Sequence, residues 1–265
     1  MKKYFTLTKA GILDVLVLRV GLFVSFFGNI IYLIIVYFLW KAIFNSSPNG
    51  IVNGMTFSDT MLYLVLAGSL VSVLEVYLVW QMGNMIQAGN IVLLLLKPIR
   101  FGAYMFFNNT GAVVVNFLVV FLPTAIIVYY VSGCGIPLGG NLLYFIPAFL
   151  LGFIINHLIN MMIGTLCLYT QSAWGINIMK EVIIGLLSGA SIPLAFFPDG
   201  IRGVVECLPF QSIYHTPLQI LLHNDLSATT LGKMYATQFM WLVILLICAT
   251  LFWKQSLKKI TVNGG

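Results

Sequence analysis

Residues 87–106 read QAGNIVLLLLKPIRFGAYMF. The apolar run at 91–96 stops at Lys97 and Pro98, so it is far shorter than the roughly 20 apolar residues that cross a membrane. It is also too apolar to lie in water. Glycine and asparagine at 83–90 predict a break before it, and the proline predicts its end, because the residue before proline is pushed out of the helical region. The sequence therefore predicts a short, buried helix between two longer ones.

The composition of the whole chain indicates a membrane protein. Of its 265 residues, 60% are hydrophobic and 8% are charged, whereas a soluble domain carries about a quarter charged residues. Only helices fit the long, non-alternating apolar runs, because lipid cannot satisfy backbone hydrogen bonds. We predict an all-α membrane protein, a single transmembrane domain over 1–265, with six transmembrane helices at 20–43, 59–82, 107–131, 142–169, 174–194 and 234–253. The first run is too long for a signal-peptide core, so we expect it to be retained.

The basic residues set the orientation of these helices. Ten of the thirteen fall on the side of the N-terminus and three on the other, and basic loops stay in the cytoplasm. We therefore predict that both termini are cytoplasmic. The inner set is Lys2, Lys3, Lys9, Arg19, Lys97, Arg100, Lys180, Lys254, Lys258 and Lys259, and the outer set is Lys41, Arg202 and Lys233. The net charge of +6 then reflects topology in a lipid bilayer, and no nucleic-acid partner is expected.

Two regions differ from the spans. Residues 1–19 mix apolar residues with charges, as a cytoplasmic helix lying along the inner membrane surface would; the alternative is that they extend the first span. Residues 194–233 are divided by prolines into pieces of two to three turns. Such pieces suit re-entrant helices that dip into the outer leaflet and return, buried against protein. Within them Asp199, Arg202 and Glu206 can line one helical face.

The other outer connections have turn chemistry. Residues 45–54 (NSSPNGIVNG) and 132–141 (SGCGIPLGGN) are rich in glycine, asparagine and proline, which predicts loops. Cys134 and Cys207 both fall on the outer side. Their spacing matches no disulfide framework or zinc motif, so the sequence leaves open whether they pair.

Polar residues within spans are candidates for function. Glu75 is the only acid expected well within a span, where it costs roughly 2.5 to 3.5 kcal/mol. It is either a cavity carboxylate that attracts cationic substrates or a buried partner for Arg19 or Lys180. A polar stripe in the fourth predicted span suits helix packing or the lining of a substrate path: Asn156, His157 and Asn160.

Catalytic and metal-binding patterns are missing from the sequence. His215 and His223 are eight residues apart, without the spacing of a metalloprotease motif. Gly232 and Lys233 are followed by Met234 and lack the upstream glycine of a phosphate-binding loop. We predict no catalytic residue, no metal site and no cofactor bound by this chain, and hence no enzyme.

Two blocks of sequence resemble one family of membrane proteins. GNIVLLLLKPI at 89–99 resembles the cytoplasmic helix between the second and third spans of ABC-2 type permeases. SGASIPLAFFPDGIRGVVECLPFQSIYHTPLQILL at 188–222 is similar to the segment that follows their fifth span. Both blocks occur in the expected order, and with the six-span layout the resemblance covers nearly the whole chain. The combination resembles the drug- and antibiotic-efflux-like branch of the family.

The resemblance implies a half-permease of an ATP-driven exporter in the cell membrane, in a bacterium. Residues 83–100 would form the coupling segment that contacts a separate ABC ATPase, which binds ATP and Mg²⁺. The residues implied in this contact are Gly89, Asn90, Ile91, Leu94, Leu95, Lys97 and Pro98. The outer re-entrant helices would close the exit, through Pro193, Phe196, Phe197, Pro198, Pro209, Phe210, Tyr214 and Pro217. Six spans are too few to enclose an export path, so a second copy or a related permease is expected to complete it.

Other interpretations stay open at this stage. On physical grounds alone, the helix at 91–96 could equally lie in the headgroups without any ATPase. As a function, the alternative is a channel or an ion-coupled secondary transporter without an ATPase. An intramembrane enzyme is a more distant alternative, since no nucleophile and base are found within a span. The cargo itself, whether drug-like, antibiotic, peptide or lipid-like, is not encoded in any recognisable pattern.

Overall fold

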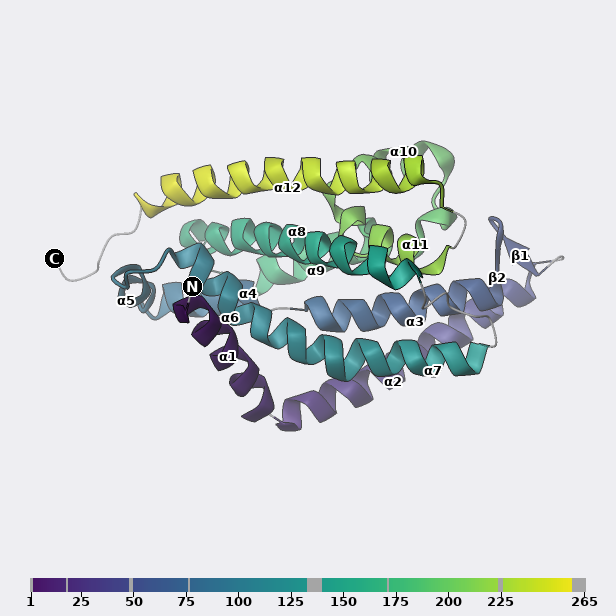
Figure 1. Ribbon diagram of the computed structural model, residues 1–265, viewed down its shortest axis with the longest axis horizontal. Helices are drawn as coiled ribbons and strands as arrows, with labels where there is room; N and C mark the ends of the chain where they lie inside the picture. The colour runs from purple at the N-terminus through teal and green to yellow at the C-terminus, as the bar shows by residue number, and fades with distance from the viewer. Residues whose placement is uncertain are drawn as a thin grey trace.

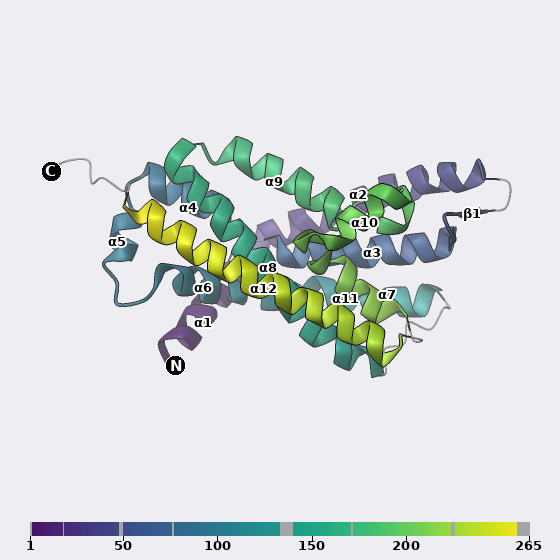
Figure 2. The same cartoon turned by 90° about the horizontal axis from the view of Figure 1, so that it is seen from above.

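Long apolar helices run between two ends of the molecule in the computed structural model (Figures 1 and 2). The structure describes residues 2–17, 19–47, 50–75, 77–132, 140–170, 172–223 and 226–258. Its α-helices are α1 (Lys2–Val17), α2 (Arg19–Asn45), α3 (Phe57–Leu74), α4 (Leu78–Gln87), α5 (Ile91–Leu95), α6 (Phe101–Asn116), α7 (Leu122–Ser132), α8 (Gly140–Thr170), α9 (Trp174–Leu187), α10 (Asp199–Cys207), α11 (His215–Leu222) and α12 (Ala228–Leu257). The shorter elements are strands β1 (Ile51–Val52) and β2 (Met55–Thr56), a π-helix at Phe117–Phe121, and 3₁₀-helices at Leu194–Phe196 and Pro209–Ser212.

Five helical segments of the described chain are long and apolar enough to cross a membrane: Phe27–Asn45, Phe57–Gln87, Phe101–Tyr130, Asn141–Thr170 and Ala228–Leu257. These correspond to five of the six predicted spans, and the all-α membrane fold is confirmed. The predicted span at 174–194 is shorter than expected. Its helix, α9, has 14 residues, or about 21 Å, against about 30 Å of hydrocarbon. It ends because Gly189 adopts a left-handed φ of 78°, which terminates helices.

The two ends of the bundle differ. The short helix α5 and the C-terminal end of α12 lie at one end, on the left of Figure 1. The β1–β2 hairpin lies at the other, with Ile51 paired to Thr56 and Val52 to Met55. Asn53 and Gly54 take positive φ angles of 49° and 80°, as a tight hairpin turn requires. The predicted loop at 45–54 is thus a hairpin where it is described, whereas that at 132–141 lies mostly outside the described residues.

The hairpin leads directly into α3, the first part of the most buried of the five candidate spans. Thr56 accepts a hydrogen bond from the backbone N–H of Asp59, whose carboxylate accepts one from Thr56 N–H. This reciprocal cap fixes the start of α3. Apolar side chains of α3 form much of the main core, which also draws on α2, α7, α8, α11 and α12. The helix α3 therefore lies in the core of the bundle, and α4 and α5 follow it toward the end opposite the hairpin.

A π-helix interrupts the third long helix before Pro123. Proline cannot donate a backbone hydrogen bond, and its ring clashes with the carbonyl four residues earlier. The π-helical turn at Phe117–Phe121 accommodates this disturbance without ending the helix. Its aromatic rings stack within the core, with Phe121 and Phe145 centroids 5.3 Å apart. The helical path from α6 to α7 therefore remains long enough to span.

The first helix, α1, packs along α6 through two glycines. A Cβ atom on Gly111 would lie 2.5 Å from the backbone oxygen of Thr8 and 2.7 Å from the carbonyl carbon of Gly11. The Thr8 hydroxyl donates to the carbonyl of Phe107 at 3.0 Å, and the rings of Tyr4 and Phe107 stack at 4.7 Å. Residues 2–17 thus form a helix separate from α2, seated on α6; its position on the membrane surface stays a prediction.

We predict that Gly111→Ala destabilises the protein, because the new methyl group meets backbone atoms that cannot move aside. The expected cost is about 1–3 kcal/mol, measured as a lower Tm of the purified protein in detergent. Gly102→Ala on the same helix is the matched control, since its Cβ would make only an ordinary 3.7 Å contact with Met161. Equal Tm values for the two variants would contradict the tight crossing.

Candidate functional site

The predicted coupling segment is a turn followed by a single turn of helix. The backbone N–H of Ala88 donates to Asn84 O at 3.0 Å, and that of Gly89 donates to Ile86 O at 3.1 Å. Gly89 then takes a φ of 70°, a conformation in which a side chain is strained. This ends α4 and redirects the chain into α5. The short helix and the turn at Gly89 therefore lie where the sequence predicted them, whereas Gly83 and Asn84, also predicted to break the helix, lie within α4.

One face of α5 anchors the turn to the bundle. Ile91 is buried with side chains of three longer helices, and the half-buried Leu94 and Leu95 pack against the same group. The group comprises Leu78 and Met82 of α4, Phe101 and Met105 of α6, and Met161 of α8. Trp253 of α12 stacks on Phe101 with ring centroids 4.6 Å apart. The short helix is therefore held by the ends of four others.

The opposite face of α5 is free of the bundle. Leu93 is 63% exposed and Leu96 is 77% exposed. Sequence reasoning named Leu94 and Leu95 as contact residues. Both are half-buried against the bundle, and their part in an ATPase contact stays a prediction. Helical spacing places positions 91, 94 and 95 on one face. Leu93 and Leu96 therefore lie on the face that is open to a partner.

The helix α4 that carries this turn is seated closely on its neighbours. A Cβ on Gly164 of α8 would lie 2.5 Å from the sulfur of Met82, and one on Gly83 would lie 2.3 Å from the Cβ of Ala173. Small residues thus let α4 approach α8 and the residue that precedes α9. Because tightly packed interfaces transmit displacement, a movement of α5 must displace α8 or α9 as well.

The helix that contains Glu75 is broken beside it. Regular helical bonding stops at Leu74 and resumes at Leu78, so the carbonyl of Leu74 loses its normal partner four residues later. The side-chain amide of Asn156 donates to this carbonyl at 2.9 Å. Asn156 is only 4% exposed, so it satisfies a backbone group that neither water nor lipid would reach. Helical bonding therefore stops at Glu75, and Asn156 compensates for the lost backbone bond. Figure 1 shows α3 and α4 as separate helices.

The amide of Asn156 belongs to a chain of hydrogen bonds that reaches α9. Asn160 Nδ2 donates to Asn156 Oδ1 at 3.0 Å, and Lys180 Nζ donates to Asn160 Oδ1 at 3.0 Å. On α9, the Asn177 amide donates to the carboxylate of Glu181. Three helices, α3, α8 and α9, are thus tied together at the level of the break.

Glu75 lies within the field of two charges on α9. It interacts electrostatically with Lys180 and Glu181, yet within the described chain it forms no ion pair, since the ammonium of Lys180 points to Asn160. The interpretation that Glu75 pairs with Lys180 is therefore not supported by a direct contact, and the side chain of Arg19 lies outside the described residues. Sequence reasoning treated Glu75 as the only acid deep in a span. The structure adds Glu181 to the same charged group.

His157 occupies a different face from the two asparagines. Its ring packs edge-on against Phe106 of α6, with centroids 5.0 Å apart, and it is 6% exposed. The predicted polar stripe therefore divides: Asn156 and Asn160 serve the break, and His157 packs against α6.

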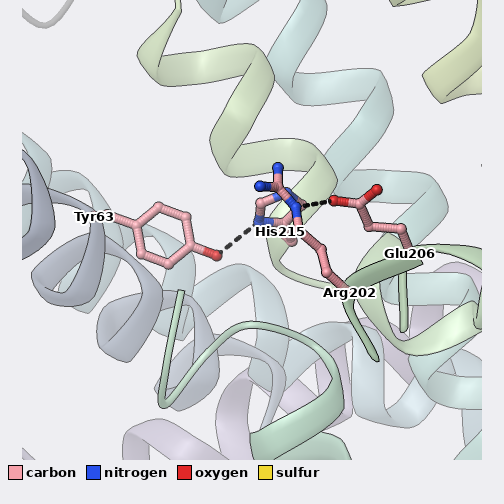
Figure 3. Close-up of polar contacts among 4 residues, drawn as sticks. All are labelled: Tyr63, Arg202, Glu206 and His215. Carbon is pink, nitrogen blue, oxygen red and sulfur yellow. Dashed lines mark hydrogen bonds and ion pairs between the residues drawn. The ribbon is translucent and has the colours of Figure 1, made fainter. Parts of the chain in front are cut away.

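A second polar group ties the outer connection to α3 (Figure 3). The Tyr63 hydroxyl donates to Gly189 O at 3.0 Å and lies 3.1 Å from His215 Nδ1. Burial, with smaller contributions from nearby Arg202 and His223, lowers the pKa of His215 to about 4, so the ring is neutral near pH 7. A proton on Nδ1 then lets the ring donate to the Tyr63 oxygen. Arg202 itself pairs with Glu206 at 2.7 Å, an exposed pair worth little.

The predicted outer-gate residues lie around this group. The ring of Phe196 packs on Trp40 of α2, with centroids 4.6 Å apart. Tyr214 is buried, and Phe210 lines an apolar pocket of about 250 Å³ between α8, α9 and α12. Of the other members, Pro193, Pro209 and Pro217 are buried, Phe197 is half-buried and Pro198 is exposed. The arrangement brings most of them together, while their role as a gate stays a prediction.

Sequence reasoning missed one link of the outer connection. Gln238 of α12 is fully buried and donates to Ala148 O at 3.1 Å and to Ser212 O at 2.9 Å. A glutamine inside a long apolar run is the signal that could have found it. Cys207 is an exposed free thiol, and Cys134 lies outside the described residues. No group of three metal-ligating side chains occurs in the described part of the chain.

This geometry defines a multi-pass helical membrane protein, with a broken second span and a short helix that projects from the end of that span. The sequence model of the family described as ABC-2 family transporter protein matches residues 30–264. The chain belongs to this family, whose members are the membrane components of ABC transporters. A search of curated proteins returns no match.

We predict that Asn156→Ala lowers stability by about 1–3 kcal/mol, the typical cost of a buried polar group without a partner. The unpaired group would be the carbonyl of Leu74. Thermal unfolding of the purified protein measures the effect, and Asn84→Ala, at an exposed position of α4, serves as the control. A variant as stable as this control would show that the break does not depend on the amide.

Proposed function

We propose that this chain is the membrane-spanning subunit of an ATP-driven exporter, and that a separate ABC ATPase binds the exposed face of α5. The observation that carries the proposal is the division of α5 into two faces. One face is anchored in the bundle by Ile91, whereas Leu93 and Leu96 stand 63% and 77% exposed. Membership of a family of ABC transporter membrane components supports an ATPase partner.

The proposed mechanism uses the broken helix as a lever. ATP holds two ATPase subunits together and hydrolysis releases them, which biases two packings of the spans. In this mechanism the ATPase pulls on α5 and α4, which turn about the break between Leu74 and Leu78. The close seating of Met82 on Gly164 and of Gly83 on Ala173 passes the movement to α8 and α9. ATP and Mg²⁺ are bound by the partner, not by this chain.

The substrate path forms at the surface shared with a second permease, either an identical copy or a related chain. Glu75 is exposed on a single subunit at the level of the break, and Lys180 lines the apolar pocket between α8, α9 and α12. A carboxylate beside apolar surface suits an organic cation or another drug-like, antibiotic, peptide or lipid-like amphiphile. The outer connection, held to α3 by Tyr63 and His215, closes the exit. The protein lies in the cell membrane with both termini in the cytoplasm, and its host is bacterial.

The coupling surface is tested by Leu93→Asp with Leu96→Asp, in cells that co-express an ABC ATPase retained by the wild-type permease. Charges on the exposed face should lower ATPase co-purification at least tenfold, because each buried leucine contributes roughly 1.5–3 kcal/mol to an interface. The Tm of the permease should not change. Leu94→Asp with Leu95→Asp is the comparison, and it should lower the Tm because these side chains support the turn. Full ATPase retention by the first variant, or ATP-independent transport by the wild type, would overturn the proposal and favour a channel or secondary transporter.

The role of Glu75 is tested by Glu75→Gln. Removal of the charge should reduce ATP-dependent uptake of a cationic dye into inverted vesicles about tenfold, the loss expected for one charge interaction of ~1.4 kcal/mol. Uptake of a neutral dye should stay within about twofold, well below one such interaction. Glu206→Gln, at an exposed outer position, is the control. Equal loss for both dyes would assign Glu75 a structural role instead.

A further inference from the structure

A cleft of about 650 Å³ opens beside the coupling segment. Its walls come from α1, from α6 and from the segment between α5 and α6. The lining residues are Tyr4, Lys97, Pro98, Ile99, Arg100, Ala103 and Phe107. The stacked rings of Tyr4 and Phe107 form its apolar side. Figures 1 and 2 place α1, α6 and α5 at the same end of the bundle.

The cleft carries positive charge that no acid neutralises. Lys97 and Arg100 line it, and the ammonium of Lys3 donates to Pro98 O at its edge, at 3.3 Å. In the part of the chain that the structure describes, none of these three forms an ion pair. Lys97 instead lies over the ring of Tyr104, 5.2 Å from its centroid. The cleft therefore suits an anion that also offers apolar surface.

The depth of the cleft in the membrane follows from α6. Arg100 is the N-cap of that helix, and the apolar segment that starts at Phe101 runs 30 residues, to Tyr130. Thirty residues extend about 45 Å, which matches a bilayer with both headgroup layers, about 40–45 Å. Arg100 therefore lies at the level of the lipid phosphates. Tyrosines such as Tyr4 and Tyr104 are typical of that level, whereas α5 projects further out (Figure 1).

We propose that this cleft binds the phosphate headgroup of an anionic phospholipid from the cytoplasmic leaflet. Lys97, Arg100 and Lys3 surround the phosphate, and the rings of Tyr4 and Phe107 contact the glycerol and upper acyl carbons. The depth favours a lipid over an acidic surface of the ATPase. The lipid would join α1 to the coupling segment and fix the position from which α5 projects. The inference rests on the cytoplasmic orientation in the proposed function and on no property of the ATPase.

The test uses the full-length permease alone, in nanodiscs of phosphatidylcholine with or without phosphatidylglycerol. Native mass spectrometry should find phosphatidylglycerol retained by the wild type. Lys97→Gln with Arg100→Gln should reduce the retention about tenfold, given the strength of two cation contacts near an anionic surface. Lys254→Gln with Lys258→Gln removes the same charge from the same end of the bundle and should leave retention within about twofold of the wild type.

Three outcomes would overturn the site. One is equal loss in both double variants, which would mean attraction by net charge alone. Another is unchanged retention in the Lys97 and Arg100 variant. The third is release of the lipid by soluble glycerol phosphate, which would show recognition of a free phosphate. Since no ATPase is present, the lipid site can stand when ATPase co-purification fails, and it can fail when co-purification succeeds.

Discussion

A helix that breaks within a membrane must find new partners for its backbone, because lipid offers none. The arrangement of this protein depends on how that demand is met at Leu74. The amide of Asn156 replaces the lost helical donor at 2.9 Å, and its own oxygen is held through Asn160 by Lys180 of α9. The helix α4 can therefore change direction relative to α3 and pack on α8. The same hydrogen bonds join α3, α8 and α9 at the level of the break.

The break divides the apolar segment Phe57–Gln87 into two parts with different roles. Before the break, α3 is a core element that is capped at its start by Thr56 and bound to the outer connection through Tyr63. Beyond the break, α4 packs closely on α8 and leads into α5, where Leu93 and Leu96 are exposed. In the described part of the chain, α5 is joined to the longer helices by side-chain packing in the group around Ile91. A segment held in this way can transmit displacement without unfolding the core.

The sequence was sufficient for the large features of this arrangement. Apolar runs of about 20 residues identify spans because their cause is a single constraint, the thickness of the bilayer. Gly89 and Pro98 predicted the limits of the short helix for equally local reasons. The same reasoning overestimated the segment at 174–194, since Gly189 ends α9 early. Hydropathy does not detect a helix that stops partway and continues through short, buried pieces.

The sequence predicted several residues of the candidate site, but it did not predict which contacts those residues make. Glu75 was recognised as costly in lipid and Asn156 as part of a polar stripe, yet their separation in sequence hides that one lies at a break and the other caps it. Leu93 and Leu96 were not singled out as the exposed side chains of this segment, because a helix of five residues gives too little periodicity to orient without its neighbours. Gly11 and Gly111 meet only once α1 is seated on α6. These features depend on tertiary contacts between distant segments.

The account requires that α5 projects into the cytoplasm. Single-cysteine proteins, made after the four native cysteines are replaced by serine, test this with a maleimide that cannot cross membranes. A cysteine at Leu96 should react in inverted vesicles and not in intact cells, whereas native Cys207, restored alone, should react only in intact cells. Reaction of the Leu96→Cys protein from outside the cell would reverse the topology, and with it the proposed ATPase contact and the proposed lipid site.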